Sequence, residues 1–277
     1  MSEPSQNQTF ILILMLTGMV AFTAIACVWM IGVVRRRGGR VSTEGLGLPD
    51  VLVSFFLCGF LGLATFISDA KTGEDGSARV LTTQQVVPNI IFFLTFVALL
   101  VGFLLVRRIS PVQLFGLRRL PPGRAFLSGV GIIATLFPAL LLVGFVVQIF
   151  LHGNAKEQEI VTLYRDVAKA GDTSNLALLL FVAVLFQPIV EEIIFRGYFY
   201  AVFKSWAGAL ASAIATATLF ATIHTTVVAF PALLVLALAL TLAYEWSGSL
   251  LVPISMHMAF NGVQLTLLTI GVHAVST

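Results

Sequence analysis

The sequence contains little charge. Of its 277 residues only 10% are Asp, Glu, Lys or Arg, whereas 58% are hydrophobic, and the mean hydropathy is +1.00. Soluble domains carry about 25% charged residues, so this composition excludes an ordinary water-soluble domain and indicates a protein that lies in lipid. The only two cysteines, Cys27 and Cys58, lie in apolar segments, where a buried free thiol is ordinary, and they give no indication of compartment.

Long apolar segments dominate the chain instead, and no repeat of fixed period interrupts them. A helix needs about 20 mainly apolar residues to cross a bilayer. The predicted fold is therefore all-α: a polytopic membrane helix bundle with about eight transmembrane helices. The predicted spans are residues 10–34, 50–68, 88–106, 125–151, 175–203, 207–228, 230–245 and 249–271.

Lys and Arg are unequally shared between the two sides of this bundle, and they accumulate on the cytoplasmic side of membrane proteins. One side carries Arg35, Arg36, Arg37, Arg40, Arg107, Arg108, Arg118, Arg119, Arg124 and Lys204. The other carries Lys71, Arg79, Lys156, Arg165 and Lys169. The bias predicts that both termini lie outside.

Short loops favour a prokaryotic plasma membrane. The sequence pI of about 9.1 indicates contact with anionic lipid headgroups rather than nucleic acid.

Ionisable residues are concentrated in the last four predicted spans. These contain Glu191, Glu192, Arg196, His224, His257 and Asn261, with Glu245 at one edge. Such groups are costly in a membrane and normally mark function. We therefore predict two parts: residues 1–110, N-terminal transmembrane helices of unassigned role, and residues 111–277, the part that does the chemistry.

The stretch "PIVEEIIFRG" places two carboxylates and an arginine on one helix. At about 100° per residue, Glu192 and Arg196 lie about 40° apart and can pair, whereas Glu191 points about 140° away from Arg196. Glu191 is thus predicted to have no ion-pair partner. A carboxyl group buried without a partner holds its proton more tightly than in water, which suits a general base. A structural salt bridge between helices is the alternative for the Glu–Arg pair.

Three further side chains complete a candidate catalytic set. His224 follows Phe220 by one helical turn, and Asn261 follows His257 by one turn. A histidine and an asparagine on one face supply two hydrogen-bond donors, which a developing oxyanion requires. Each residue alone also fits a simple interhelical hydrogen bond.

The order and spacing of "EEIIFRG", "FATIH" and "HMAFN" resemble the three motifs of the CPBP family of intramembrane proteases. That family includes CAAX prenyl endopeptidases and bacterial proteins linked to bacteriocin immunity. The stretch "LFGLRR" is also similar, and the resemblance covers residues 112–265, which makes residues 111–277 a CPBP-like core.

The resemblance implies an intramembrane endopeptidase that hydrolyses peptide bonds of a peptide or membrane protein. It implies catalytic roles for Glu191 as the base that activates water, His224 in holding that water, and His257 and Asn261 as oxyanion donors. Glu192, Arg196 and Phe220 are expected to be supporting residues. Those roles come from the resemblance rather than from spacing.

Two alternatives remain open. The first is a zinc-dependent version of the same protease, in which Glu191, His224 and His257 would bind Zn²⁺. No H-E-x-x-H motif supports it, so no cofactor and no metal is expected. The second alternative is a non-catalytic membrane scaffold or bacteriocin-immunity protein. Transport is disfavoured because the two halves of the chain differ sharply in polarity.

The depths expected for the candidate residues in the membrane differ too much for the residues to meet at one site. Counted from the cytoplasmic ends of upright helices, Glu191 lies about 18 Å deep, His224 about 25 Å and His257 about 12 Å. Tilted helices, or bends at Pro188 and Pro253, are expected to bring these residues together.

Overall fold

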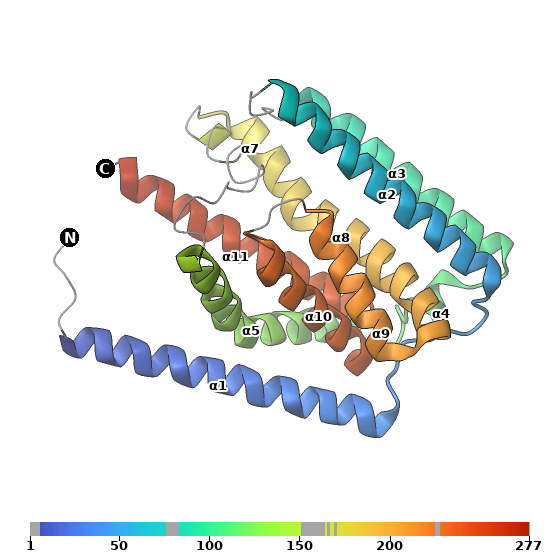
Figure 1. The fold of residues 1–277 in the computed structure, drawn as a ribbon, viewed down its shortest axis with the longest axis horizontal. Helices are drawn as coiled ribbons and strands as arrows, with labels where there is room; N and C mark the ends of the chain where they lie inside the picture. Colours follow the sequence, from blue (N-terminus) through green and yellow to red (C-terminus); the bar gives the residue numbers. More distant parts are fainter. Residues whose placement is uncertain are drawn as a thin grey trace.

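The computed structural model describes residues 6–75, 83–150, 164, 167–168, 171–224 and 228–276. These residues form helices joined by short turns, and no strand occurs among them. The prediction of an all-α helical membrane bundle is confirmed. In Figure 1 the long helices run between two ends of the molecule, so that the start of α1 and the end of α11 lie on the same side.

The N-terminal half contains three long helices, a single short turn of helix and a fourth long helix. These are α1 (Gln6–Arg37), α2 (Leu48–Asp75), α3 (Thr83–Val106), α4 (Pro111–Leu114) and α5 (Pro122–Phe150).

From residue 171 on, the described residues form five α-helices and two π-helical segments, which are labelled η. These are α7 (Thr173–Leu180), η1 (Phe181–Phe186), α8 (Gln187–Glu192), η2 (Ile193–Tyr200), α9 (Ala201–Thr222), α10 (Phe230–Ser247) and α11 (Leu251–Ser276).

Five helical segments of the described residues are long and apolar enough to cross a membrane, so the predicted count of eight is not confirmed. The five are Val86–Val106, Pro122–Val147, Thr173–Thr222, Phe230–Ser247 and Leu251–Ile270. The third is 50 residues long and kinks within α9 at Gly208, whose φ of 78° and ψ of 169° are not helical. Only glycine adopts such a conformation readily. The predicted break at 204–206 therefore falls at Gly208.

A large buried cluster joins the two halves of the chain, and a second, small cluster pairs Val86 of α3 with Leu179 of α7. Helix α5 packs along α11, α9 packs on α10, and α1 contacts both α5 and α10. Leu100 and Leu104 of α3 belong to the same hydrophobic cluster as Phe220 and Leu236. Residues 1–110 therefore contribute to the core around the C-terminal helices, whatever further role they have.

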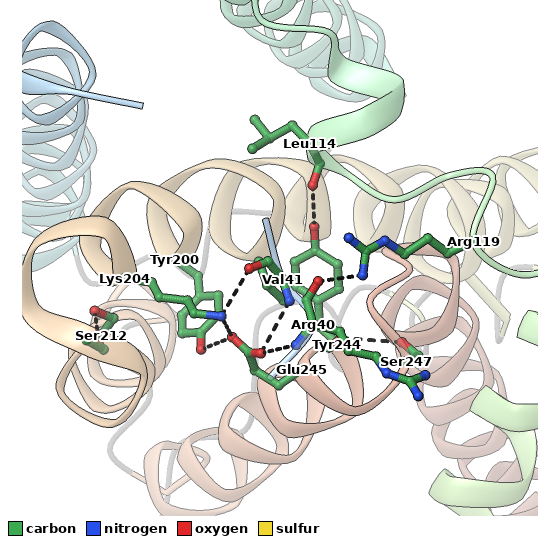
Figure 2. A network of polar contacts seen from close by, with 11 residues as sticks. Arg40, Val41, Leu114, Arg119, Tyr200, Lys204, Ser212, Tyr244, Glu245 and Ser247 are labelled. Atoms are coloured by element: carbon green, nitrogen blue, oxygen red, sulfur yellow. Dashed lines mark hydrogen bonds and ion pairs between the residues drawn. The ribbon is translucent and has the colours of Figure 1, made fainter. Parts of the chain in front are cut away.

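A buried carboxylate fastens the loop after α1 to this core (Figure 2). Glu245, 3% exposed and in the last turn of α10, accepts hydrogen bonds from Tyr200 Oη at 2.6 Å and Lys204 Nζ at 2.5 Å. Its other oxygen accepts the backbone N–H groups of Arg40 at 2.9 Å and Val41 at 3.3 Å. Lys204 also donates to the carbonyl of Val41 at 3.0 Å. Glu245 thus links α1, α9 and α10 at one end of the bundle.

Glu245→Gln is expected to lower the thermal unfolding midpoint of the purified protein in detergent. The substitution leaves Lys204 without its anionic partner, and breaking a buried ion pair costs about 3 kcal/mol. Glu44→Gln, at an exposed carboxylate of the same loop region, is the matched control and should leave the midpoint unchanged. Equal midpoints for the two variants would show that Glu245 does not hold this end together.

Candidate functional site

The site forms around α8, a six-residue α-helix between two π-helical segments. In a π-helix an N–H bonds to the carbonyl five residues earlier, and such segments occur often at functional sites. The N–H of Gln187 follows this pattern and donates to the carbonyl of Val182. The two π segments shift the faces of the helix on both sides of the paired glutamates.

Glu192 lies at the centre of the polar cluster and is fully buried. Its Oε1 accepts a hydrogen bond from Arg196 Nη1 at 2.7 Å and another from His257 Nδ1 at 2.9 Å. The predicted pairing of Glu192 with Arg196 is confirmed. The contact with His257 was not predicted, and it joins α8 to α11.

Arg196 is held from three directions. Besides its bond to Glu192, Nη2 donates to the backbone carbonyl of Ala237 in α10 at 3.2 Å. The guanidinium also lies over the ring of Phe220 in α9, 4.6 Å from its centroid, in the geometry of a cation–π contact. Arg196 is only 1% exposed, so its charge is balanced inside the protein rather than by solvent.

Glu191 is buried, with 7% of its surface exposed. Its Oε1 accepts a hydrogen bond from the side-chain amide of Gln187 at 2.8 Å. Its Oε2 lies 3.8 Å from His257 Nε2, which is beyond hydrogen-bond length. Arg196 pairs with Glu192 and not with Glu191, as the helical spacing predicted, but the hydrogen bond from Gln187 was not predicted. Gln187, which sequence analysis missed, lies one turn earlier on the same face, and that spacing was the available signal.

The imidazole of His257 lies between the two glutamates. Nδ1 faces Glu192 Oε1, and Nε2 faces Glu191 Oε2. An ionised carboxylate accepts hydrogen bonds and cannot donate them, so the proton of this contact is on Nδ1. The ring is 4% exposed, and Glu192 fixes both its tautomer and its orientation.

Phe220 forms the apolar wall that these groups share. It is fully buried, and its ring centroid lies 4.6 Å from that of His224 and 5.9 Å from that of His257. His224 Nδ1 lies 2.7 Å from the carbonyl of Phe220. Sequence analysis placed His224 inside a span over 207–228, but α9 ends at Thr222. His224 thus lies just past the helix end, half-buried.

Asn261 forms an interhelical hydrogen bond, which the sequence analysis gave as the alternative to an oxyanion role. Its Nδ2 donates to the backbone carbonyl of Ala183 in η1 at 2.8 Å. In the π-helical pattern this carbonyl would receive the N–H of residue 188, but Pro188 has none. Asn261 satisfies the carbonyl that Pro188 leaves open. His257 and Asn261 lie on one helix as predicted, yet each is held by a different part of the neighbouring chain.

The structure brings together two of the residues that were expected to lie at different depths in the membrane. Glu191 and His257 approach within 3.8 Å, although upright helices would separate them. The expected bend at Pro253 is wrong, because Pro253 lies in the first turn of α11, where proline fits a regular helix. The irregularity lies instead in the π segments around α8 and in the kink at Gly208.

His257 and Phe220 are the shared neighbours of the predicted catalytic residues Glu191 and His224 and of the predicted supporting residues Glu192 and Arg196. Asn261, the remaining predicted catalytic residue, contacts Ala183 instead. Glu191, Glu192 and Arg196 connect through His257 and the carboxylates, and His224 connects through Phe220. Within the described ranges, no group of three or more His, Cys, Asp or Glu side chains is arranged to hold a metal ion.

The fold and this cluster define a class: a helical membrane protein with a buried acid–imidazole site. Residues 173–263 match a family model described as type II CAAX prenyl endopeptidase Rce1-like. All residues of the three motifs lie inside the match, whereas the "LFGLRR" stretch precedes it. Searches of curated proteins and of solved structures returned no match.

The matched segment belongs to the CAAX protease family, as the motifs predicted. This family consists of proteases, and the apolar helices make the chain an integral membrane protein. The match supports a CAAX-type intramembrane protease in general.

Glu192→Gln is expected to destabilise the fold by about 3–5 kcal/mol, because Arg196 would be left buried without its anionic partner. The readout is the thermal unfolding midpoint in detergent. Glu191→Gln is the matched control: it changes the adjacent carboxylate, which forms no direct ion pair with Arg196, and should retain most of the stability. A midpoint equal to that of the wild type in Glu192→Gln would contradict the assigned structural role.

Proposed function

We propose that the chain is an intramembrane endopeptidase in which Glu191 activates a water molecule for attack on a peptide bond. The observation that carries this proposal is the unequal use of the two glutamates. Glu192 Oε1 binds Arg196 and His257, and its Oε2 is fully buried without a hydrogen-bond partner among the described residues. Glu191 instead accepts a hydrogen bond from the neutral amide of Gln187 at Oε1, and its Oε2, in a side chain that keeps some exposure, faces His257 Nε2 at 3.8 Å. An ionised carboxylate oriented in this way is suited to accept a proton.

In the first step Glu191 Oε2 accepts a proton from water as the water oxygen bonds to the carbonyl carbon of the substrate. The carbonyl oxygen becomes an oxyanion. In the second step the C–N bond breaks, and the proton moves from Glu191 to the departing amine. The products are a carboxylic acid and an amine, so water is the only other reactant.

His257 is proposed to stabilise the oxyanion. Glu191, Glu192 and Arg196 together carry one net negative charge when ionised, and a proton on His257 would neutralise the cluster. Because Nδ1 is committed to Glu192, Nε2 donates a hydrogen bond only when the ring carries this second proton. The imidazolium is therefore the form that can bind an oxyanion, and preorganised donors of this kind are strong in a site of low dielectric constant.

His224 and Asn261 are assigned supporting contacts with the reactants. A carbonyl can only accept, so the proton of the His224–Phe220 contact lies on Nδ1. His224 is proposed to help hold the attacking water beside Phe220. The amide of Asn261 carries two protons, of which one binds the carbonyl of Ala183. The second is proposed to bind the oxyanion alongside His257.

The proposed substrate is a peptide or membrane protein that enters from the bilayer, without a metal cofactor. We place the protein in a prokaryotic plasma membrane with both termini outside. The basic segments 35–40 and 107–124 would then face the cytoplasm. The alternative of a non-catalytic scaffold or immunity protein uses the same contacts but does not need an ionised Glu191.

Glu191→Gln and His224→Ala are expected to abolish cleavage of a membrane-peptide library by the purified protein, while leaving it folded and inserted. Gln keeps the shape of Glu191 but cannot accept the proton, and loss of a general base costs about 10²–10⁴-fold in rate. Mass spectrometry of the products gives the readout. Cleavage at the wild-type rate by Glu191→Gln would favour the scaffold.

Prolonged treatment with a metal chelator is expected to leave the cleavage rate unchanged, because the proposed base acts on water without a metal ion. The same assay measures the rate before treatment, after treatment, and after zinc is added back. Loss of activity in chelator that zinc restores would instead establish the zinc-dependent alternative.

A further inference from the structure

Gln187 donates a hydrogen bond to Glu191, and it lies just before the first of the three recognised motifs. It is the first residue of α8, and its amide lies one helical turn before the glutamate on the same face. The donor–acceptor distance of 2.8 Å is that of a well-formed hydrogen bond. Gln187 itself is partly buried, so the two groups meet where competition from solvent is limited.

The bond distinguishes between the two oxygens of Glu191. Oε1 is occupied by Gln187, whereas Oε2 is the oxygen that faces His257 Nε2. A carboxylate without the first contact could rotate about its terminal torsion, which is broad for glutamate. The amide therefore determines which oxygen is presented to the reactants.

A neutral donor suits this position better than a charged one. An arginine or lysine would form a full ion pair with Glu191, as Arg196 does with Glu192, and would make it a weaker base. An amide hydrogen bond favours the ionised carboxylate to a smaller extent. It orients the base without cancelling its charge.

We propose that Gln187 is a positioning residue for the reaction: its amide holds Oε1 of Glu191, so that Oε2 is the proton-accepting oxygen. This inference rests on the proposed function, because it assigns Gln187 a task only if Glu191 is the base.

The charged groups near Glu191 that influence its protonation are few. Its own helix contributes Glu192 and Arg196, α11 contributes His257, and His224 lies beyond Phe220. Helix α3 and segment η1 also pack against α8, and neither contains an ionisable side chain. Replacing Gln187 with an uncharged residue therefore changes the hydrogen bond to Glu191, while the charged groups around Glu191 stay the same.

The test compares the pH dependence of kcat/KM for peptide cleavage by the wild type and by Gln187→Met, which has a similar length but no donor. The acidic limb of the profile is expected to move to higher pH by about one to two units, because a hydrogen bond to a charged group contributes about 1.5–3 kcal/mol and one unit corresponds to about 1.4 kcal/mol. Gln187→Glu should move it further in the same direction through like-charge repulsion. Ile189→Met, at an exposed position of the same helix, is the control and should leave the limb in place.

The outcomes separate this inference from the proposed function. If Glu191→Gln is inactive but both Gln187 variants keep the wild-type acidic limb, the positioning role is overturned and the base remains. If the variants lose only thermal stability, Gln187 is structural and the inference is likewise overturned. If Glu191→Gln cleaves normally, both proposals are contradicted together.

Discussion

The hydrogen bonds to one carboxylate oxygen, Glu192 Oε1, organise the rest of the site. A buried carboxylate needs partners for its charge, and this one obtains them from Arg196 on its own helix and from His257 on α11. The same contacts fix the guanidinium over Phe220 and fix the tautomer of His257. The neighbouring Glu191 forms neither of these hydrogen bonds and accepts one from the neutral amide of Gln187 instead, which is the difference on which its proposed role as the base depends.

A second buried acid has a comparable role at one end of the bundle. Glu245 binds two side chains and two backbone N–H groups, and so joins the loop after α1 to α9 and α10. Lys204 and Arg196 belong to one continuous stretch of helix, η2 followed by α9. The N-terminal segment is therefore connected through polar contacts to the stretch that carries the site, although it lies outside the family match.

The sequence predicted the helical class, the motif residues and the Glu192–Arg196 pair, because each follows from composition or from regular helical geometry. It did not predict the π segments around α8, since no residue pattern marks a change from i→i+4 to i→i+5 bonding. It therefore missed that Pro188 opens the carbonyl that Asn261 binds. It also missed Gln187, because the argument from charge considered only ionisable partners. The kink at Gly208 lies close to the break predicted at 204–206, whereas the end of α9 at Thr222 came earlier than the predicted span end at residue 228.

The central claim is that Glu192 holds His257 with the proton on Nδ1. The most direct test is the nitrogen-15 NMR spectrum of histidine-labelled protein in detergent, with the His257 signals assigned by their loss in His257→Gln. The account predicts a protonated Nδ1 in a hydrogen bond that disappears in Glu192→Gln. A neutral ring with its proton on Nε2 and a bare Nδ1 would contradict it.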